Sequence, residues 1–327
     1  MRVLVTGGAG YIGSVTTAML LGAGHDVTVL DDLSTGHRDA VPDRARFVEA
    51  DVRAAGDVLA RERFDAVLHF AARSLVGDSV ADPADYWHTN VGGTTALLDA
   101  VRAHGVGRFV FSSTAAVYGD PAAIPIRETS ETRPTNPYGA SKLAVDHMIG
   151  SYATAYGLAA VSLRYFNVAG AHAGLGERHA RETHLIPLVL EVARGLREHI
   201  VIHGTDWDTP DGTCIRDYIH IADLARAHLL ALDAAVPGRH EVCNLGNGTG
   251  FSVREVVDTA RQVTGHPIPS REGPRRAGDP AVLVAAAEHA AEFLGWRPEL
   301  PDLAGIIADA WAFHSAPGTP ADTAPGE

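Results

Sequence analysis

The sequence contains little cysteine and no long apolar run. Its two cysteines, Cys214 and Cys243, are too far apart to form a metal-binding or redox motif, so we expect a reducing, cytoplasmic environment. A run of about 18 apolar residues, the length that crosses a membrane, does not occur. The apolar run before the first glycines is too short to indicate a signal peptide.

Positive charge is also scarce. Lys and Arg together number 27 against 40 Asp and Glu, which gives a formal net charge of -13. This balance disfavours nucleic acid or an anionic membrane as a partner, but a local arginine cluster can still bind an anionic small ligand. With 327 residues, of which 46% are hydrophobic and 20% charged, the chain is long enough for two globular domains.

A glycine-rich loop follows the first expected strand. Residues 3–5 form a short apolar run typical of a buried parallel strand, and a helical pattern covers residues 14–23. Between them lie Gly7, Gly10 and Gly13. This order of strand, loop and helix predicts a dinucleotide site, because small residues let the backbone approach a pyrophosphate at the helix N-terminus.

Acidic residues follow the next two expected strands. Asp31 and Asp32 end the second strand, about 20 residues after the glycine loop, where a carboxylate accepts the ribose hydroxyls of adenosine. A carboxylate here would repel a 2′-phosphate, so NAD is favoured over NADP. Asp51 ends the third strand, where its carboxylate could meet the adenine amino group.

Tyr138 and Lys142 lie on one face of a helix expected from Pro137 to about Tyr156, because four residues span about one turn. A free tyrosine has a pKa near ~10 and is a poor base at neutral pH. We expect the lysine cation to lower the tyrosine pKa. The pair then suits general base catalysis at a hydroxyl.

Hydroxyl side chains end the strand expected over residues 108–113. Ser112 and Thr114 should face the ligand crevice of a doubly wound sheet, whereas ordinary turn chemistry explains Ser113. We interpret His69, inside an apolar strand, as a packed core histidine. The repeated β-α-β pattern predicts an α/β fold, with a doubly wound parallel (Rossmann) sheet and a smaller C-terminal α/β domain.

Two features of the second half raise further alternatives. Histidines 172, 179 and 184 suggest a metal site, but we expect none because no cysteine or carboxylate set completes it. Arg275 and Arg276 could bind a phosphate in a bidentate way or form a solvated surface pair. Their spacing alone does not decide between these two roles.

Five motifs together resemble the UDP-glucose (UDP-galactose) 4-epimerases, a family of extended short-chain dehydrogenase/reductases. The motifs are Thr6–Gly13, His69–Ala72, Tyr138–Lys142, Leu163–Asn167 and Asp211–His220. The resemblance covers roughly residues 1 to 312. It implies a tightly held NAD, a UDP-sugar substrate and a homodimer formed by helices near 90–104 and 139–156.

The resemblance also implies roles for individual residues. Tyr138 matches the general base, Lys142 its partner, and Thr114 the residue that binds the sugar hydroxyl and can relay its proton. The implied cofactor-binding residues are Gly7, Gly10, Tyr11, Ile12, Gly13, Asp31, Asp32, Asp51, Val52, Phe70, Ala71, Ala72, Asn90, Ser112, Tyr138, Lys142 and Tyr165. The implied substrate-binding residues are Thr114, Tyr138, Asn167, His184, Leu185, Val201, His203, Arg216, Tyr218, Arg276 and Asp279, with the arginines on the diphosphate.

The resemblance further implies a division of the chain into domains. Residues 1–167 and about 214–237 are expected to bind NAD, and about 168–213 and 238–314 the UDP-sugar, followed by a disordered tail over 315–327. The sequence departs from some relatives at two places. Arg73 and Ser74 stand near a position where some relatives carry lysine, and Leu283 stands where a bulky residue restricts the sugar pocket in some members.

The implied reaction is the NAD-dependent interconversion of UDP-galactose and UDP-glucose by oxidation at C4, rotation of the 4-keto sugar and re-reduction. Alternatives are 4-epimerisation of UDP-N-acetylhexosamine, UDP-xylose/arabinose or UDP-glucuronate, and a non-catalytic NAD-binding regulator. A regulator would be expected to lack Tyr138 or Lys142. A 4,6-dehydratase is disfavoured because Ala115 and Ala116, which follow Thr114, carry no acid or base.

Overall fold

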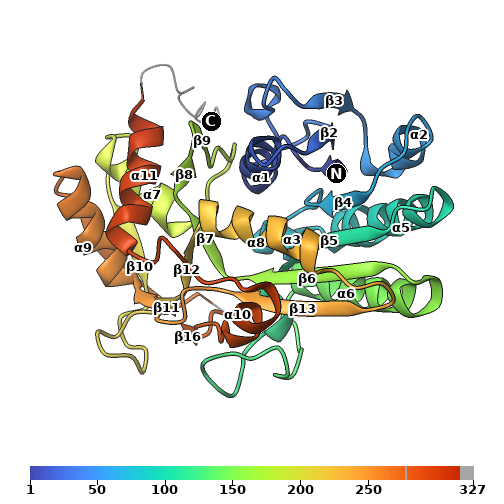
Figure 1. Ribbon diagram of the computed structural model, residues 1–327. Coiled ribbons are helices and arrows are strands. Elements are labelled where there is room, and N and C mark those ends of the chain that lie inside the picture. The colour runs from blue at the N-terminus through green and yellow to red at the C-terminus, as the bar shows by residue number, and fades with distance from the viewer. Residues whose placement is uncertain (277, 317–327) are drawn as a thin grey trace.

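The structure is a computed structural model that describes residues 1–276 and 278–316. At its centre lies a seven-stranded sheet in the order β13-β6-β5-β4-β1-β2-β3, with every pair parallel (Figure 1). These strands are β1 (Arg2–Thr6), β2 (Asp26–Asp31), β3 (Arg46–Glu49), β4 (Ala66–His69), β5 (Arg108–Thr114), β6 (Ala159–Tyr165) and β13 (His240–Leu245). The predicted doubly wound α/β sheet is confirmed.

Helices cover both faces of this sheet, because alternate strand side chains point to opposite sides and both sets are apolar. Val3 and Val5 of β1 face the core cluster that includes helices α1 (Tyr11–Gly22) and α8 (Ile221–Ala234). Leu4 faces the opposite cluster, with side chains from α2, α5 and α6. Their bounds are α2 (Ala55–Leu59), α5 (Gly93–Ala103) and α6 (Pro137–Tyr156). The result is a three-layer arrangement.

A smaller lobe lies beside the sheet, on the left in Figure 1, where three helices pack around their own apolar cluster. They are α7 (Leu185–Ala193), α9 (Val253–Thr264) and α11 (Leu303–Ser315). Short strands join the lobe to the rest: β10 (Ile200–His203) pairs with β15 (Ser270–Gly273), β12 (Tyr218–His220) with β7 (Asn167–Ala169), and β8 (Ala171–His172) with β9 (Leu175–Gly176). Strand β11 (Ile215–Arg216) lies between β14 (Phe251–Ser252) and β16 (Val282–Leu283).

The remaining elements are short. They are α3 (Val76–Ala81), α4 (Pro83–Tyr86), α10 (Glu288–Leu294), a π-helical turn η3 (Trp87–Gly92), and 3-10 turns η1 (Arg38–Ala40), η2 (Val52–Ala54) and η4 (Ala115–Tyr118). The helix expected near 90–104 is therefore preceded by a π-turn. Within residues 1–276 and 278–316, no helix has both the length and the apolar character needed to cross a membrane.

One predicted boundary is wrong. Residues from 238 onward were expected in the substrate-binding domain, but β13 completes the central sheet by parallel pairing with β6. A strand that pairs with β6 shares its core, so its place follows from packing that the chain order does not reveal. Of the tail expected over 315–327, Ser315 ends α11, and 317–327 lie outside the described residues.

Candidate active site

Strands β1 and β4 pair in parallel, and the helices that follow them lie on opposite faces of the sheet, which is where ligands bind in open α/β sheets. Gly7, directly after β1, has a φ of +74°, a conformation that favours glycine. A Cβ at Gly7 would lie 2.4 Å from the backbone nitrogen of Ala71, just beyond β4. The glycine loop therefore packs directly against the segment containing Phe70 and Ala71, two residues predicted to bind NAD.

Asp31 holds the glycine loop in place. Its Oδ2 accepts a hydrogen bond from the Ala9 backbone N–H at 2.9 Å, and its Oδ1 accepts one from Leu33 at 2.9 Å. Burial raises the pKa of Asp31, and the two backbone donors counteract that rise. Asp51 instead pairs with Arg53 at 2.6 Å, and the hydrogen bond from Arg53 lowers the pKa of Asp51. The predicted adenosine contacts of both carboxylates stay predictions.

The π-turn before α5 directs Asn90 inward, where its side chain is only 2% exposed. Its Oδ1 accepts a hydrogen bond from the Arg73 backbone N–H, and its Nδ2 donates to the Arg73 carbonyl and to Ser141 Oγ. Asn90 thus fixes the segment after β4. The Arg73 side chain points away from these hydrogen bonds, because its Nε pairs with Asp85 at 2.9 Å.

Tyr138 approaches Thr114 because the start of α6 carries a glycine. Asn136 caps the helix by accepting a hydrogen bond from the Gly139 N–H at 2.9 Å. A Cβ on Gly139 would lie 2.5 Å from the carbonyl oxygen of Ala116, so the helix packs directly on the turn after Thr114. The Thr114 side chain interacts with the Tyr138 phenol and lowers its pKa. The structure thus brings two predicted catalytic residues together.

Lys142 lies one turn further along α6 and is 2% exposed. Its Nζ donates a hydrogen bond to the carbonyl oxygen of Ser112 at 2.8 Å and lies 4.8 Å from the centre of the Phe111 ring. Burial lowers the pKa of Lys142 to about 7. Burial also raises the pKa of Tyr138, although the Thr114 hydrogen bond opposes that rise.

The expected lowering of the Tyr138 pKa is therefore wrong for the chain by itself. The Lys142 ammonium points at Ser112 and is 6.0 Å from the centre of the Tyr138 ring. Since Lys142 itself loses charge on burial, the desolvation of the phenol outweighs its field.

Ser112 and Ser113 face opposite sides of the sheet, as successive strand residues must. The Ser112 hydroxyl is hydrogen-bonded to the hydroxyl of Tyr165, which was also predicted to contact the cofactor. Ser113 Oγ instead donates to Asp146, which forms a buried ion pair of 2.9 Å with Arg164. Ser113 therefore belongs to the packing beneath α6. His69 is likewise a core residue, 2% exposed and hydrogen-bonded on both ring nitrogens.

The predicted diphosphate-binding arginines converge on Asp279. Arg216 Nη2 lies 3.8 Å from one of its carboxylate oxygens, and Arg276 Nε lies 3.5 Å from the other. Arg275 points elsewhere: it pairs with Asp206 at 2.7 Å and lies 4.1 Å above the centre of the Trp207 ring. The two adjacent arginines thus contact different partners, which the sequence spacing could not show.

A cavity of about 330 Å³ lies next to Arg276 in the smaller lobe. It is lined by Thr183, Leu185, Leu188, Arg197, Glu198, His199, Ile200, Val201, His203 and Arg276. Four of these were predicted to bind the substrate: Leu185, Val201, His203 and Arg276. Tyr218 is buried at 4% exposure, which raises its pKa to about 12, and its strand β12 pairs with Asn167 in β7.

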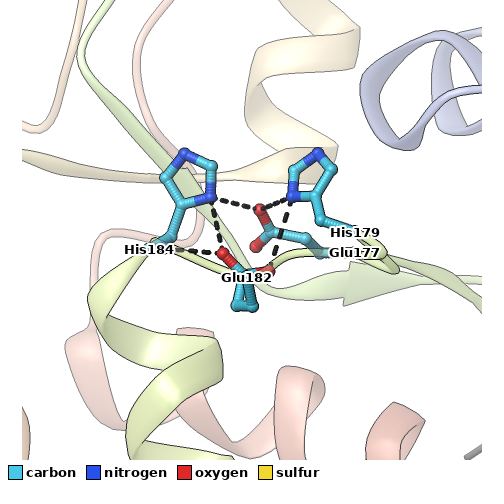
Figure 2. Close-up of side chains that lie close together, drawn as sticks. All are labelled: Glu177, His179, Glu182 and His184. Carbon is cyan, nitrogen blue, oxygen red and sulfur yellow. Dashed lines mark hydrogen bonds and ion pairs between the residues drawn. The ribbon is translucent and has the colours of Figure 1, made fainter. Parts of the chain in front are cut away.

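His184 is not among the residues that line this cavity, and its side chain points toward two carboxylates, as Figure 2 shows. Glu177, His179, Glu182 and His184 place their ligand atoms within 4.8 Å of one another. The expectation that no carboxylates would complete a metal site is therefore wrong, because two glutamates lie beside His179 and His184. The sequence signal was Glu-x-His-x-x-Glu-x-His over residues 177–184. Hydrogen bonds to the glutamates offset burial and raise the pKa of His179 to about 9.

Comparison with known proteins identifies the relatives of this chain. The sequence model of the NAD dependent epimerase/dehydratase family matches residues 3–246. The chain belongs to this family. A UDP-glucose 4-epimerase of Corynebacterium glutamicum is 60% identical over 319 residues, which cover 97% of each chain.

Solved structures agree with this assignment. The UDP-glucose 4-epimerase of Brucella ovis in complex with NAD has a TM-score of 0.91 and 47% identity, covering 95% of this chain and 97% of that one. The enzyme of Bifidobacterium longum in complex with NAD+ and UDP has a TM-score of 0.90 and 38% identity, covering 96% and 99%. These likenesses extend over both the sheet and the smaller lobe.

Proposed function

We propose that this family member is an NAD-dependent UDP-glucose 4-epimerase that interconverts UDP-galactose and UDP-glucose. The observation that carries the proposal is the packing of the start of α6 on the turn after Thr114, which brings Tyr138 and Lys142 to the carboxyl end of β5. The relatives named above carry this activity in their names, and one was solved with NAD+ and UDP.

The residues that line the crevice fit the cofactor. Gly7 leaves the backbone free to approach a pyrophosphate, and the N-terminus of α1 follows directly, where an anion is favoured. When bound, NAD accepts a hydride from C4 of the sugar and later returns it. We assign the cofactor to the residues predicted from the resemblance, with Asp31 and Asn90 also fixing the loops that form its walls.

Proton transfer falls to Tyr138 and Thr114. Tyr138 can accept a proton only as its phenolate, which a bound nicotinamide cation would favour. A C4 hydroxyl that donates to Thr114 could then pass its proton through the Thr114 hydroxyl to the Tyr138 phenolate. The proton returns by the same route when the 4-keto sugar is reduced. Lys142 Nζ lies 6.0 Å from the centre of the Tyr138 ring and donates to the Ser112 carbonyl, which joins α6 to the end of β5.

The diphosphate is assigned to Arg216 and Arg276, which converge on Asp279. Guanidinium groups bind phosphate oxygens in a bidentate way. Binding energy gathered at the nucleotide holds the substrate while the hexose turns to present its other face. The cavity lined by Leu185, Val201 and His203 lies next to Arg276 and is assigned to the nucleotide.

The choice of sugar rests on the surroundings of Leu283. This residue pairs in register with Arg216 in the parallel ladder of β16 and β11, which places it beside an assigned phosphate contact. A leucine is intermediate in size, so UDP-N-acetylhexosamines stay an alternative substrate. Parallel assays with UDP-N-acetylgalactosamine and UDP-galactose measure this preference directly.

We also propose a homodimer through the helices near 90–104 and 139–156. This face carries the exposed Tyr156, 57% exposed, whose ring packs edge-on against Tyr152 at 5.2 Å. Trp87, at the start of the π-turn, is 44% exposed. Light scattering after gel filtration should give twice the chain mass, and a Tyr156→Glu change should shift it toward the monomer. A monomeric wild-type chain would refute the dimer.

The division into domains and the location in the cell complete the proposal. The sheet with its flanking helices, including β13, forms the NAD-binding domain, and the lobe of α7, α9 and α11 forms the substrate-binding domain. A cytoplasmic location is supported by Cys214 and Cys243, which are buried and unpaired thiols. Cell fractionation with an antibody against the chain tests the location.

The deciding experiment incubates the purified chain with UDP-galactose and no added cofactor, followed by chromatography of the products. UDP-glucose is expected, because NAD is expected to stay bound through the cycle. A Tyr138→Phe change should lower kcat by about 10²-fold or more while NAD stays bound. Tyr86→Phe is the matched control, because its ring lies 6.4 Å from that of Tyr138 and its hydroxyl donates to Leu75. No turnover even with added NAD would contradict the proposal.

The arginine assignment has its own matched pair. Arg276→Ala should weaken UDP binding by about tenfold or more, as the loss of a charge-assisted bidentate contact does. Arg275→Ala should leave UDP affinity nearly unchanged, since Arg275 is bound to Asp206 and Trp207. Equal effects of the two changes, measured by calorimetry with UDP, would remove the distinction between them.

A further inference from the structure

Glu177, His179, Glu182 and His184, called here the Glu-His cluster, bring four metal-ligating atoms together just before α7 (Figure 2). We propose that the Glu-His cluster is a structural binding site for a divalent transition-metal ion, with zinc the best match. The inference does not depend on the proposed epimerase activity, because it concerns a loop between the two lobes.

The spacing of the ligand atoms carries the proposal. His184 Nδ1 lies 2.8 Å from Glu177 Oε1 and 2.9 Å from Glu182 Oε1. His179 Nδ1 lies 3.0 Å from Glu177 Oε1 and 3.4 Å from Glu182 Oε2. Four ligands arranged tetrahedrally around zinc, with bonds of about 2.0–2.1 Å, lie about 3.3 Å apart. Small movements of the four side chains would therefore admit the ion.

The donor set selects the kind of ion. Calcium and magnesium take oxygen ligands, whereas imidazole nitrogens suit zinc and its neighbours in the first transition row. Two carboxylates balance the charge of a divalent cation. If each of the four residues supplies one ligand, no position is left for water or substrate, and such closed sites are typical of structural rather than catalytic zinc.

The carboxylates are already held in position. Glu177 and Glu182 have side chains that are only 6% and 7% exposed. Glu182 Oε1 also accepts hydrogen bonds from the backbone N–H groups of Thr183 and His184, both at 2.6 Å. Such outer contacts orient ligands and increase metal affinity.

The ion would fasten a loop that connects the two lobes. Within this loop, the Arg178 carbonyl is hydrogen-bonded to His37 at 2.8 Å, and the Arg178 guanidinium pairs with Asp39 at 2.7 Å. The loop ends at His184, which is the N-cap residue of α7, and Leu185 then lines the nucleotide cavity. A metal bound here would stabilise a loop that contacts the segment after β2 through Arg178 and leads into α7.

The test measures metal directly. The untagged full chain is incubated with zinc sulfate, freed of loose metal by gel filtration and analysed by inductively coupled plasma mass spectrometry. About one zinc per chain is expected. His179→Gln should weaken zinc binding by about tenfold or more, measured by competition with a chromophoric chelator. His172→Gln, a matched change at an exposed histidine outside the cluster, should keep the wild-type affinity.

Two results would overturn the proposal. One is a wild-type chain that retains no stoichiometric zinc, and the other is equal zinc affinity of the His179 and His172 variants. Cobalt(II) gives a second reading on the wild-type chain alone, so it does not depend on whether a variant folds. Intense visible bands of four-coordinate cobalt support the site, whereas the weak spectrum of six-coordinate cobalt contradicts it.

Discussion

Lys142 is the only lysine in the sequence, and its ammonium group lies where little stabilises a positive charge. The side chain is 2% exposed, and its Nζ contacts the Ser112 carbonyl and the face of Phe111. Asp146, the carboxylate that favours its charged form, is already paired with Arg164 at 2.9 Å. We therefore predict that Lys142 titrates near neutral pH in the chain freed of nucleotide.

The size of the effect follows from burial. The pKa of Lys142 falls from its usual value of 10.5 to about 7. This difference corresponds to about 5 kcal/mol in favour of the neutral amine, since each pKa unit is worth about 1.4 kcal/mol. At pH 7, roughly half of the molecules would then carry an uncharged Lys142. An exposed lysine would be almost fully charged at the same pH.

The assay uses the single lysine. A chain grown with lysine labelled with carbon-13 at Cε gives one lysine resonance, so its titration needs no assignment. The chemical shift is followed from pH 5 to pH 11, and the midpoint is read before and after NAD is added. A midpoint near 10.5 without NAD would refute the reasoning, because burial would then have no net effect on Lys142.

Three further predictions concern the fold around the site. Gly7→Ala should destabilise the chain by about 1–3 kcal/mol more than Gly24→Ala and should reduce the NAD content. Both glycines have a positive φ, but only at Gly7 would the added Cβ clash with backbone atoms. Equal melting temperatures and NAD contents of the two variants would contradict this prediction. Asp146→Ala should lower the free energy of unfolding in urea by about 3–5 kcal/mol, because it leaves the buried guanidinium of Arg164 without its carboxylate. A loss below about 1 kcal/mol would contradict the importance of this buried ion pair. Between pH 7 and pH 5 the unfolded chain takes up a proton at His69, whose pKa in the folded chain is about 3, so wild-type stability should fall by about 2 kcal/mol from this group. His69→Gln should remove that part of the pH dependence, whereas the same change at the exposed His104 should not; equal slopes for both variants would show that His69 is not the source.

Local signals made the catalytic half of the site predictable. Helix α6 begins and ends where the sequence indicates, because Pro137 occupies its first turn and Gly157 adopts the left-handed conformation that ends it. The glycine loop was predictable for the same reason, because the apolar strand, the glycines and the helical pattern follow one another within a few residues. Helical spacing places Tyr138 and Lys142 on one face, whereas their proposed catalytic role also rests on the glycine loop and on the hydroxyl side chains at the end of β5.

The parts that the sequence did not reveal depend on contacts between distant segments or on side-chain direction. Strand β13 joins the central sheet only because β6 has a free edge to pair with, which chain order does not show. Arg275 and Arg276 are neighbours with the same chemistry, and only their directions assign one to Asp206 and the other to Asp279. The pKa of Tyr138 also required the structure, since burial and a nearby cation act in opposite directions.

The distribution of rigidity across the site matches what epimerisation demands of a protein. Tyr138, Thr114 and Lys142 lie on the central sheet and α6, so the proposed proton-transfer groups would keep one position while the sugar presents first one face and then the other. The assigned phosphate contacts lie on short strands and a loop of the smaller lobe, and the Arg276 side chain is 60% exposed. An anchor on such elements can hold the nucleotide from the outside without filling the space in which the hexose turns. A site built entirely within the sheet would fix the sugar as firmly as the base, and would oxidise C4 without permitting the second face to react.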